Sequence, residues 1–314
     1  MRFKIAAFTI AVLACALVLW PPRPVRNDLR ITFMDVGQGD AILIQTPRGH
    51  AIMIDTGGRL EQSESDDGAS VAESVGEKVV VPFLIRQGIH HVDAILLTHP
   101  HGDHVGGIAP ILRALGADVF FDGGQEYGGR AYHDALDEAK KRHVRMVAPH
   151  AGDVWKTDDG VRLRFLTDSG TPIDDPADGV NENSLVAMLE CDCGRTRPFR
   201  VLFMGDAGKL SEDILLARHA DLHADVLKVG HHGSRFASGS QFLAAVGAHD
   251  AVISDGRHNL YHHPAPETLA ALAAAGMRVW RTDVCGAITL SVHGARTNRW
   301  RATASTACIV GGNH

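Results

Sequence analysis

Aromatic side chains are scarce in this 314-residue sequence: Phe, Trp and Tyr make up 6% of it, whereas glycine occurs 33 times. That composition suits a fold with many turns. An excess of basic charge is also missing, because the formal net charge is −6. No overall positive field therefore draws the chain to nucleic acid, and the charge total gives no support to a local basic groove.

Several common active-site motifs are absent as well. The sequence contains no P-loop, no G-x-G-x-x-G between a strand and a helix, and no G-x-S-x-G elbow. Cysteine is sparse, with Cys15 near the N-terminus and four more at Cys191, Cys193, Cys285 and Cys308. The last four could form disulfides in an exported protein, and Cys191 and Cys193 could instead bind a metal. The sequence leaves these alternatives open.

The N-terminus reads as a targeting segment. Arg2 and Lys4 precede the apolar run Ile5–Trp20, which ends at a proline-rich stretch without a small-residue cleavage site. We therefore expect an uncleaved membrane anchor and an exported protein. The predicted division is an anchor or signal segment with its linker at 1–27, a hydrolase domain at 28–300, and a C-terminal tail at 301–314.

Predicted strands and helices alternate along the proposed domain, which is typical of layered α/β packing. The most informative stretch follows the apolar run Ala94–Leu97, a predicted buried strand. Four residues able to bind a metal occur there within six positions: His99, His101, Asp103 and His104. On a loop at a strand end, they can converge on two ions, and imidazole with carboxylate suits zinc, manganese or iron.

Similar clusters follow later predicted strands. Asp206 comes after Phe199–Met204; as a lone residue it would cap a helix, but it can also bridge two cations. His231, His232 and Ser234 follow the next strand. Ser234 beside two histidines could suggest a serine nucleophile, but the neighbouring clusters favour a metal site.

Aspartates beside glycine stand at the ends of the first predicted strands: Asp35, Asp40 and Asp55. Such residues either cap turns or support a site.

Together these clusters resemble the metallo-β-lactamase superfamily, whose H-x-H-x-D-H signature matches His99–His104. Within it, the sequence resembles the hydrolase domain of ComEC-type competence proteins of bacteria. The stretches that carry this resemblance include Phe33–Asp40, Ile54–Gly58, Leu227–Ser234 and His263-Pro264. The resemblance implies a four-layer αββα fold.

The resemblance also implies a ligand set for two divalent ions, zinc or manganese. His99 and His101 would hold metal one, Asp103, His104 and His231 would hold metal two, and Asp206 would bridge them. His231 is preferred over His232 because Gly230-His231 matches the superfamily's pattern. Asn183 and Ser184 stand where many members carry a third histidine, so metal one should bind more weakly and be incompletely occupied.

The activity that the resemblance implies is hydrolysis by a metal-bound hydroxide, with DNA as the expected substrate of a phosphodiesterase or nuclease. Asp103 would also orient the nucleophile. His263, or secondly His232, would contact the phosphate or protonate the leaving group. The supporting positions around the site would be Asn183, Ser184, Ser234, Asp35, Asp40 and Asp55.

One departure limits the substrate prediction: ComEC proteins have many membrane helices, and this chain has at most one. Two alternatives therefore stay open. The first is a hydrolase of small phosphodiesters or other esters and thioesters on the same fold. The second is a non-catalytic accessory protein of DNA uptake.

Overall fold

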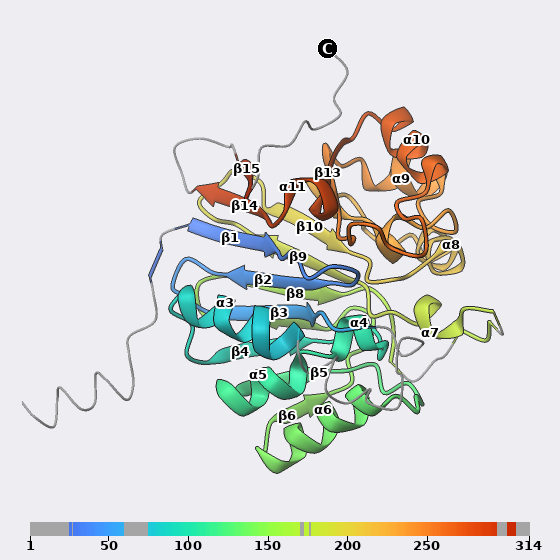
Figure 1. The fold of residues 1–314 in the computed structure, drawn as a ribbon. Coiled ribbons are helices and arrows are strands. Elements are labelled where there is room, and N and C mark those ends of the chain that lie inside the picture. The colour runs from blue at the N-terminus through green and yellow to red at the C-terminus, as the bar shows by residue number, and fades with distance from the viewer. Residues whose placement is uncertain are drawn as a thin grey trace, which may run out of the picture.

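Two facing β-sheets form the centre of the molecule (Figure 1). The computed structural model describes residues 25–26, 28–59, 75–169, 173–175, 177–293 and 300–305. The first sheet has eight strands in the order β15-β14-β1-β2-β3-β4-β5-β6, and the second has seven in the order β13-β12-β11-β10-β9-β8-β7.

The strands of the first sheet are β1 (Asp28–Phe33), β2 (Ala41–Gln45), β3 (Ala51–Thr56), β4 (Val92–Leu96), β5 (Ala117–Phe121), β6 (Arg145–Val147), β14 (Ile288–His293) and β15 (Trp300–Ala304). Those of the second are β7 (Val154–Lys156), β8 (Val161–Phe165), β9 (Ala187–Cys191), β10 (Phe199–Phe203), β11 (Val226–Lys228), β12 (Asp250–Ile253) and β13 (Arg278–Arg281).

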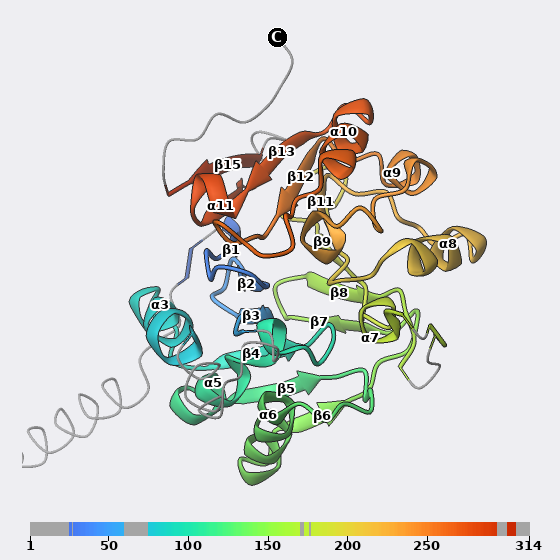
Figure 2. The ribbon, with the colours of Figure 1, turned by 45° about the vertical axis from the view of Figure 1, so that its right-hand side comes forward.

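Helices cover the outer faces of both sheets, on opposite sides of the molecule in Figure 2. Beside the first sheet are η2 (Gly76–Val80), α3 (Val81–Arg86), α4 (Gly102–Val105), α5 (Ile108–Ala114) and α6 (Arg130–Lys141). The second half of the chain contributes α7 (Gly179–Glu182), α8 (Lys209–Ala217), η3 (Gly230–Gly233), α9 (Ser240–Val246), α10 (Pro266–Ala274) and α11 (Thr282–Cys285).

Three hydrophobic clusters hold these layers together. One lies between the sheets and takes alternate residues of β1 and β10, among them Phe33 and Phe203. The second packs the first sheet under α3, α5 and α6, and the third packs the second sheet under α8, α9 and α10. Strands such as β2 and β4 are buried at every position because both of their faces are covered. The predicted four-layer αββα arrangement is confirmed.

Parallel pairing brings many strand ends to one edge of the sandwich. Strands β3, β4, β5 and β6 pair in parallel, as do β10, β11, β12 and β13. Loops after parallel strands therefore collect at their carboxyl ends, where α/β proteins bind ligands. This explains why residues far apart in the sequence can share one site.

The predicted boundary between the domain and the C-terminal tail, at residue 300, falls within β15. Residues 301–304 belong to β15, which pairs with β14 in antiparallel register. Trp300, Ala302 and Ala304 alternate toward the core between the sheets, so the last strand extends the sheet.

The predicted anchor Met1–Trp20 lies outside the described residues, and its role stays a prediction. Among the helices that the structure does describe, none is long and apolar enough to cross a membrane. Of the alternatives for the cysteines, Cys191 and Cys193 form a disulfide with each other.

Glu212 gives the fold a testable dependence on pH. Its buried carboxylate accepts hydrogen bonds from the backbone N–H groups of Ser238 and Gly239. Burial outweighs these bonds and raises the pKa of Glu212 from 4.5 to about 7. Between these values the folded state keeps a proton that the unfolded chain has lost, so stability falls as pH rises.

We expect Glu212→Gln to remove this contribution. Relative to wild type, the variant should gain about 1–3 kcal/mol of unfolding free energy between pH 5 and pH 8. Denaturant unfolding at both pH values measures the difference, and Asp213→Asn on the exposed face of α8 is the control. An equal pH dependence in wild type and Glu212→Gln would contradict the assignment.

Candidate metal centre

The H-x-H-x-D-H stretch begins at the end of β4 and enters the short helix α4. Two glycine turns press against this helix. A Cβ on Gly39 would lie 2.2 Å from the carbonyl oxygen of Asp103, and one on Gly58 would lie 1.8 Å from that of Gly102. Both glycines have positive φ, +111° and +151°. The turns after β1 and β3 therefore need glycine to approach α4 and fix its position.

Asp55, at the end of β3, organises the first side of the site. Its carboxylate accepts hydrogen bonds from the backbone N–H of Thr98 at 2.8 Å and from the Thr98 hydroxyl at 2.7 Å. The same carboxylate accepts the Nδ1–H of His104 at 2.8 Å. This bond fixes the His104 ring with Nε2 facing inward, as carboxylates do for metal-binding histidines.

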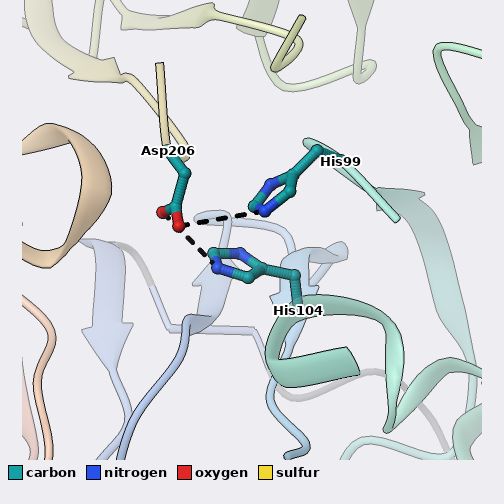
Figure 3. Close-up of side chains that lie close together, drawn as sticks. All are labelled: His99, His104 and Asp206. Atoms are coloured by element: carbon teal, nitrogen blue, oxygen red, sulfur yellow. Dashed lines mark ion pairs between the residues drawn. The ribbon is translucent and has the colours of Figure 1, made fainter. Parts of the chain in front are cut away.

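Asp206 meets two histidines at the centre of the site (Figure 3). Its Oδ1 lies 3.4 Å from Nε2 of His104, and its Oδ2 lies 3.8 Å from Nε2 of His99. The backbone N–H of Asp206 donates to the hydroxyl of Ser184. The side chain of Ser184 thus positions Asp206 by binding the backbone of Asp206.

Of the two neighbouring histidines after β11, His232 turns into this cluster. Its Nε2 lies 3.4 Å from Asp206 Oδ2, 3.5 Å from Asp103 Oδ2 and 3.3 Å from Nε2 of His104. Its Nδ1–H donates to the carbonyl of Ser254. His231 instead lies beside Asp178 and Asn181 and joins none of the tight groups of possible metal ligands among the described residues.

This placement differs from the expectation that His231 is the histidine that joins the cluster, and it favours His232 as the ligand. His231 and His232 both adopt left-handed backbone conformations, with φ of 47° and 52°. Left-handed conformations are costly for residues other than glycine, and they concentrate at functional sites.

Three imidazoles present the same nitrogen, Nε2, to the centre of the cluster, as metal-binding histidines do. Each of His99, His104 and His232 can donate its Nδ1–H away from the centre, His99 to the hydroxyl of Thr98. Their Nε2 lone pairs then face each other and the carboxylates. Buried oxygens of Asp103 and Asp206 also have no hydrogen-bond partner within the described part of the chain. The donor set therefore matches a divalent metal site.

Ligand atoms from these residues are close enough to share ions. Each of three sets lies within 4.8 Å: His99, His104 and Asp206; Asp103, His104 and His232; and Asp40, Asp206 and His232. His101 sits at the edge of the cluster and, like His231, joins none of these groups among the described residues; its Nδ1 lies 3.1 Å from Nε2 of His99 and its ring is edge-on to Tyr127.

The proton affinities of these groups point the same way. Burial holds the pKa of His99 well below its usual value, so the ring is neutral. Burial also opposes charge on His232, but Asp206 and Asp103 outweigh it and raise the pKa of His232 to about 10. Likewise, neighbouring carboxylates overcome burial and raise the pKa of His104 well above its usual value. The carboxylates thus draw positive charge to the place that a metal ion would occupy.

The other predicted residues lie around the cluster in different roles. Asn183 is bonded within its own loop, to Ile173 and Gly179. Ser234 caps the backbone N–H of Phe236, and the exposed Asp35 caps the turn at Gly37. These contacts give Asn183, Ser234 and Asp35 local structural roles.

His263 stands closer to the site. Its ring centroid lies 5.7 Å from that of His231, and burial lowers the pKa of His263 to about 4. His263 is therefore a neutral ring at the rim.

Two residues beside the site, Asn181 and Lys228, were not predicted from the sequence. Asn181 in α7 has an amide near His231, and its buried Oδ1 lacks a hydrogen-bond partner among described residues. Lys228, the last residue of β11, is fully buried against Asp40. A lysine within the apolar stretch before Gly230 was the available signal for Lys228, because a charge in a buried strand calls for a partner.

The fold and the buried ligand cluster define a metallo-hydrolase. The family model described as "Metallo-beta-lactamase superfamily" matches residues 34–256, more than half of the chain, and the chain belongs to this superfamily. A solved structure, "CmlA beta-hydroxylase E377D mutant", shares the fold at a TM-score of 0.51 and 11% identity, over 86% of this chain and 55% of that one.

Among curated proteins, the chain is similar to ComE operon protein 3 of Bacillus subtilis (strain 168), at 33% identity over 83% of this chain and 33% of the relative. It is also similar to competence protein ComA of Neisseria gonorrhoeae, at 27% identity over 92% of this chain and 36% of the relative. Recombination protein 2 of Haemophilus influenzae is 28% identical over 89% of this chain and 31% of that protein. The chain thus spans about a third of the length of these relatives.

Proposed function

We propose that this protein is a metal-dependent phosphodiesterase that cleaves DNA. The observation that carries the proposal is the set of inward Nε2 atoms of His99, His104 and His232 around the carboxylates of Asp103 and Asp206. Divalent ions bound there would act as Lewis acids and lower the pKa of a water nucleophile. The names of the relatives, which include a competence protein and a recombination protein, favour DNA as the substrate.

The chain's own residues divide the remaining work. Asp206 would contact both ions, with His99 and His101 on one side and Asp103, His104 and His232 on the other. The oxygen of Asp103 that has no hydrogen-bond partner among the described residues would orient the attacking water. His263, neutral near pH 7, contacts the phosphate through a hydrogen bond, which suits its place on the rim better than full proton transfer.

Surface features beside the site bear on the size of the substrate. Phe236 and Tyr261 are large exposed side chains on the loops that follow His232 and precede His263. Such rings can stack on bases. On the other side, a cleft of about 660 Å³ opens at His101, and its lining includes five carboxylates: Glu126, Asp168, Asp174, Asp175 and Asp178.

The acidic cleft opposes a long polyanion on that side, because like charges at close range repel. A DNA strand would therefore approach over His263 and Tyr261. A small phosphodiester could reach the ions without crossing the acidic cleft. The cleft therefore favours a second candidate function, the hydrolysis of such a small diester.

The test uses the full chain, stripped of metal by a chelator and refilled with manganese or zinc. We expect cleavage of end-labelled single-stranded DNA only with metal, and a loss in kcat on the order of 100-fold in His263→Ala. The exposed neighbour His262 gives the matched control, His262→Ala, which should retain activity. Turnover of bis-p-nitrophenyl phosphate without DNA cleavage would favour the small-diester function. Metal binding without any turnover would favour an accessory role.

A further inference from the structure

One lysine of the described part of the chain, Lys228, is fully buried. The side chain of Lys228 is 0% exposed, and within the described residues it is the only lysine or arginine among the buried ones. Its Nζ lies 2.8 Å from Oδ2 of Asp40 and donates to the carbonyl of Val229 at 2.9 Å. Burying a charge is costly, and even a buried ion pair is often no more stabilising than apolar residues of the same size. This pair therefore calls for an explanation other than packing.

Asp40 is within reach of the metal centre. A carboxylate oxygen of Asp40 lies within 4.8 Å of ligand atoms of Asp206 and His232. Its buried Oδ1 has no hydrogen-bond partner in the described part of the chain. Asp40 therefore has the position and the free oxygen of a metal ligand, while Lys228 occupies its other oxygen.

We propose that Lys228 is a positioning residue that holds Asp40 outside the coordination shell of the metal ions. The fixed positive charge of Lys228 neutralises Asp40 and lowers the affinity of the centre for cations. It also keeps one coordination position open, which distinguishes catalytic from structural metal sites. This inference rests on the proposed metal centre but not on DNA as the substrate.

The inference predicts effects of opposite sign from the two partners. Lys228→Met should free Asp40 to bind, so zinc should bind roughly tenfold more tightly while turnover falls. Asp40→Asn should leave Lys228 unpaired beside the ions, so zinc should bind roughly tenfold more weakly. If the pair only supports the fold, both variants should weaken zinc binding and stability together.

The measurement is competition of the full chain with a chromogenic chelator for zinc, alongside thermal unfolding with and without the metal. A further readout is the visible spectrum of the cobalt-loaded protein, whose bands should weaken in Lys228→Met as a ligand is added. Unchanged or weaker zinc binding in Lys228→Met overturns the proposal. If that variant fails to fold, Lys228→Gln decides in its place, because the amide keeps a donor without the charge, and it too must bind zinc more tightly.

The outcome is separable from that of the proposed function. Wild-type protein that binds neither zinc nor manganese would remove the metal centre and this inference with it. Wild-type protein that binds metal, with both variants weakened alike, would overturn only the role of Lys228. The presence or absence of DNA cleavage affects neither result.

Discussion

Asp206→Asn is expected to abolish hydrolysis, with a loss of at least about 1,000-fold in kcat. Asp206 contacts three histidines of the cluster: its oxygens lie 3.4–3.8 Å from Nε2 atoms of His99, His104 and His232. The amide keeps the shape of the carboxylate but removes the negative charge that offsets the cations. The variant should therefore lose metal as well as activity.

Metal content after dialysis, measured by mass spectrometry of the dissolved sample, should accompany the activity assay. Ser184→Ala is a graded comparison, because it removes only the acceptor for the backbone N–H of Asp206. A loss of about 10- to 100-fold is expected there, as for other supporting groups at metal sites. Full activity in Asp206→Asn would refute the metal centre as we describe it.

His232→Ala is expected to cost one bound ion and at least about 100-fold in kcat, whereas His231→Ala keeps the metal. The two residues are adjacent and chemically identical, so each is the control for the other. His232 is 2% exposed and points at Asp103 and Asp206, while His231 is 20% exposed beside Asp178. The expectation thus follows from the orientation and burial of the two side chains.

Metal stoichiometry of the two variants decides between them. Loss of an ion in His231→Ala with retention in His232→Ala would restore the ligand set that the sequence resemblance implied. Thermal unfolding should show both proteins folded, because neither imidazole packs in a hydrophobic cluster. A similar loss in both would indicate that the whole loop after β11 had moved.

Much of the site could be predicted because ligands follow the ends of apolar strands. His99 and Asp206 follow closely after β4 and β10, His104 comes next in α4, and parallel pairing brings such strand ends together. The choice between His231 and His232 could not be predicted in the same way. It depends on two successive left-handed residues, and the residue types alone do not say which histidines adopt that conformation.

The loop before β9 shows a similar limit. Two asparagines stand two positions apart, and their residue types carry the same chemistry. Asn183 bonds to the backbone of Ile173 and Gly179, whereas Asn181 faces His231. Tertiary contacts decide which of the two side-chain amides forms hydrogen bonds within the loop and which one faces the site. Likewise β15, a short edge strand with exposed alternate residues, has too weak an apolar pattern to be distinguished from a tail.

The division of the ligands between the two sheets has a consequence for how the protein would lose activity as it unfolds. His99 and His104 come from the first sheet, and Asp206 and His232 come from the second, so a shared ion would clasp the two halves of the sandwich at one edge. Its binding energy would then oppose their separation. Activity would then report on the integrity of the whole fold, because separation of the two sheets at this edge would release the metal ion, and with it the activity, before the protein unfolds.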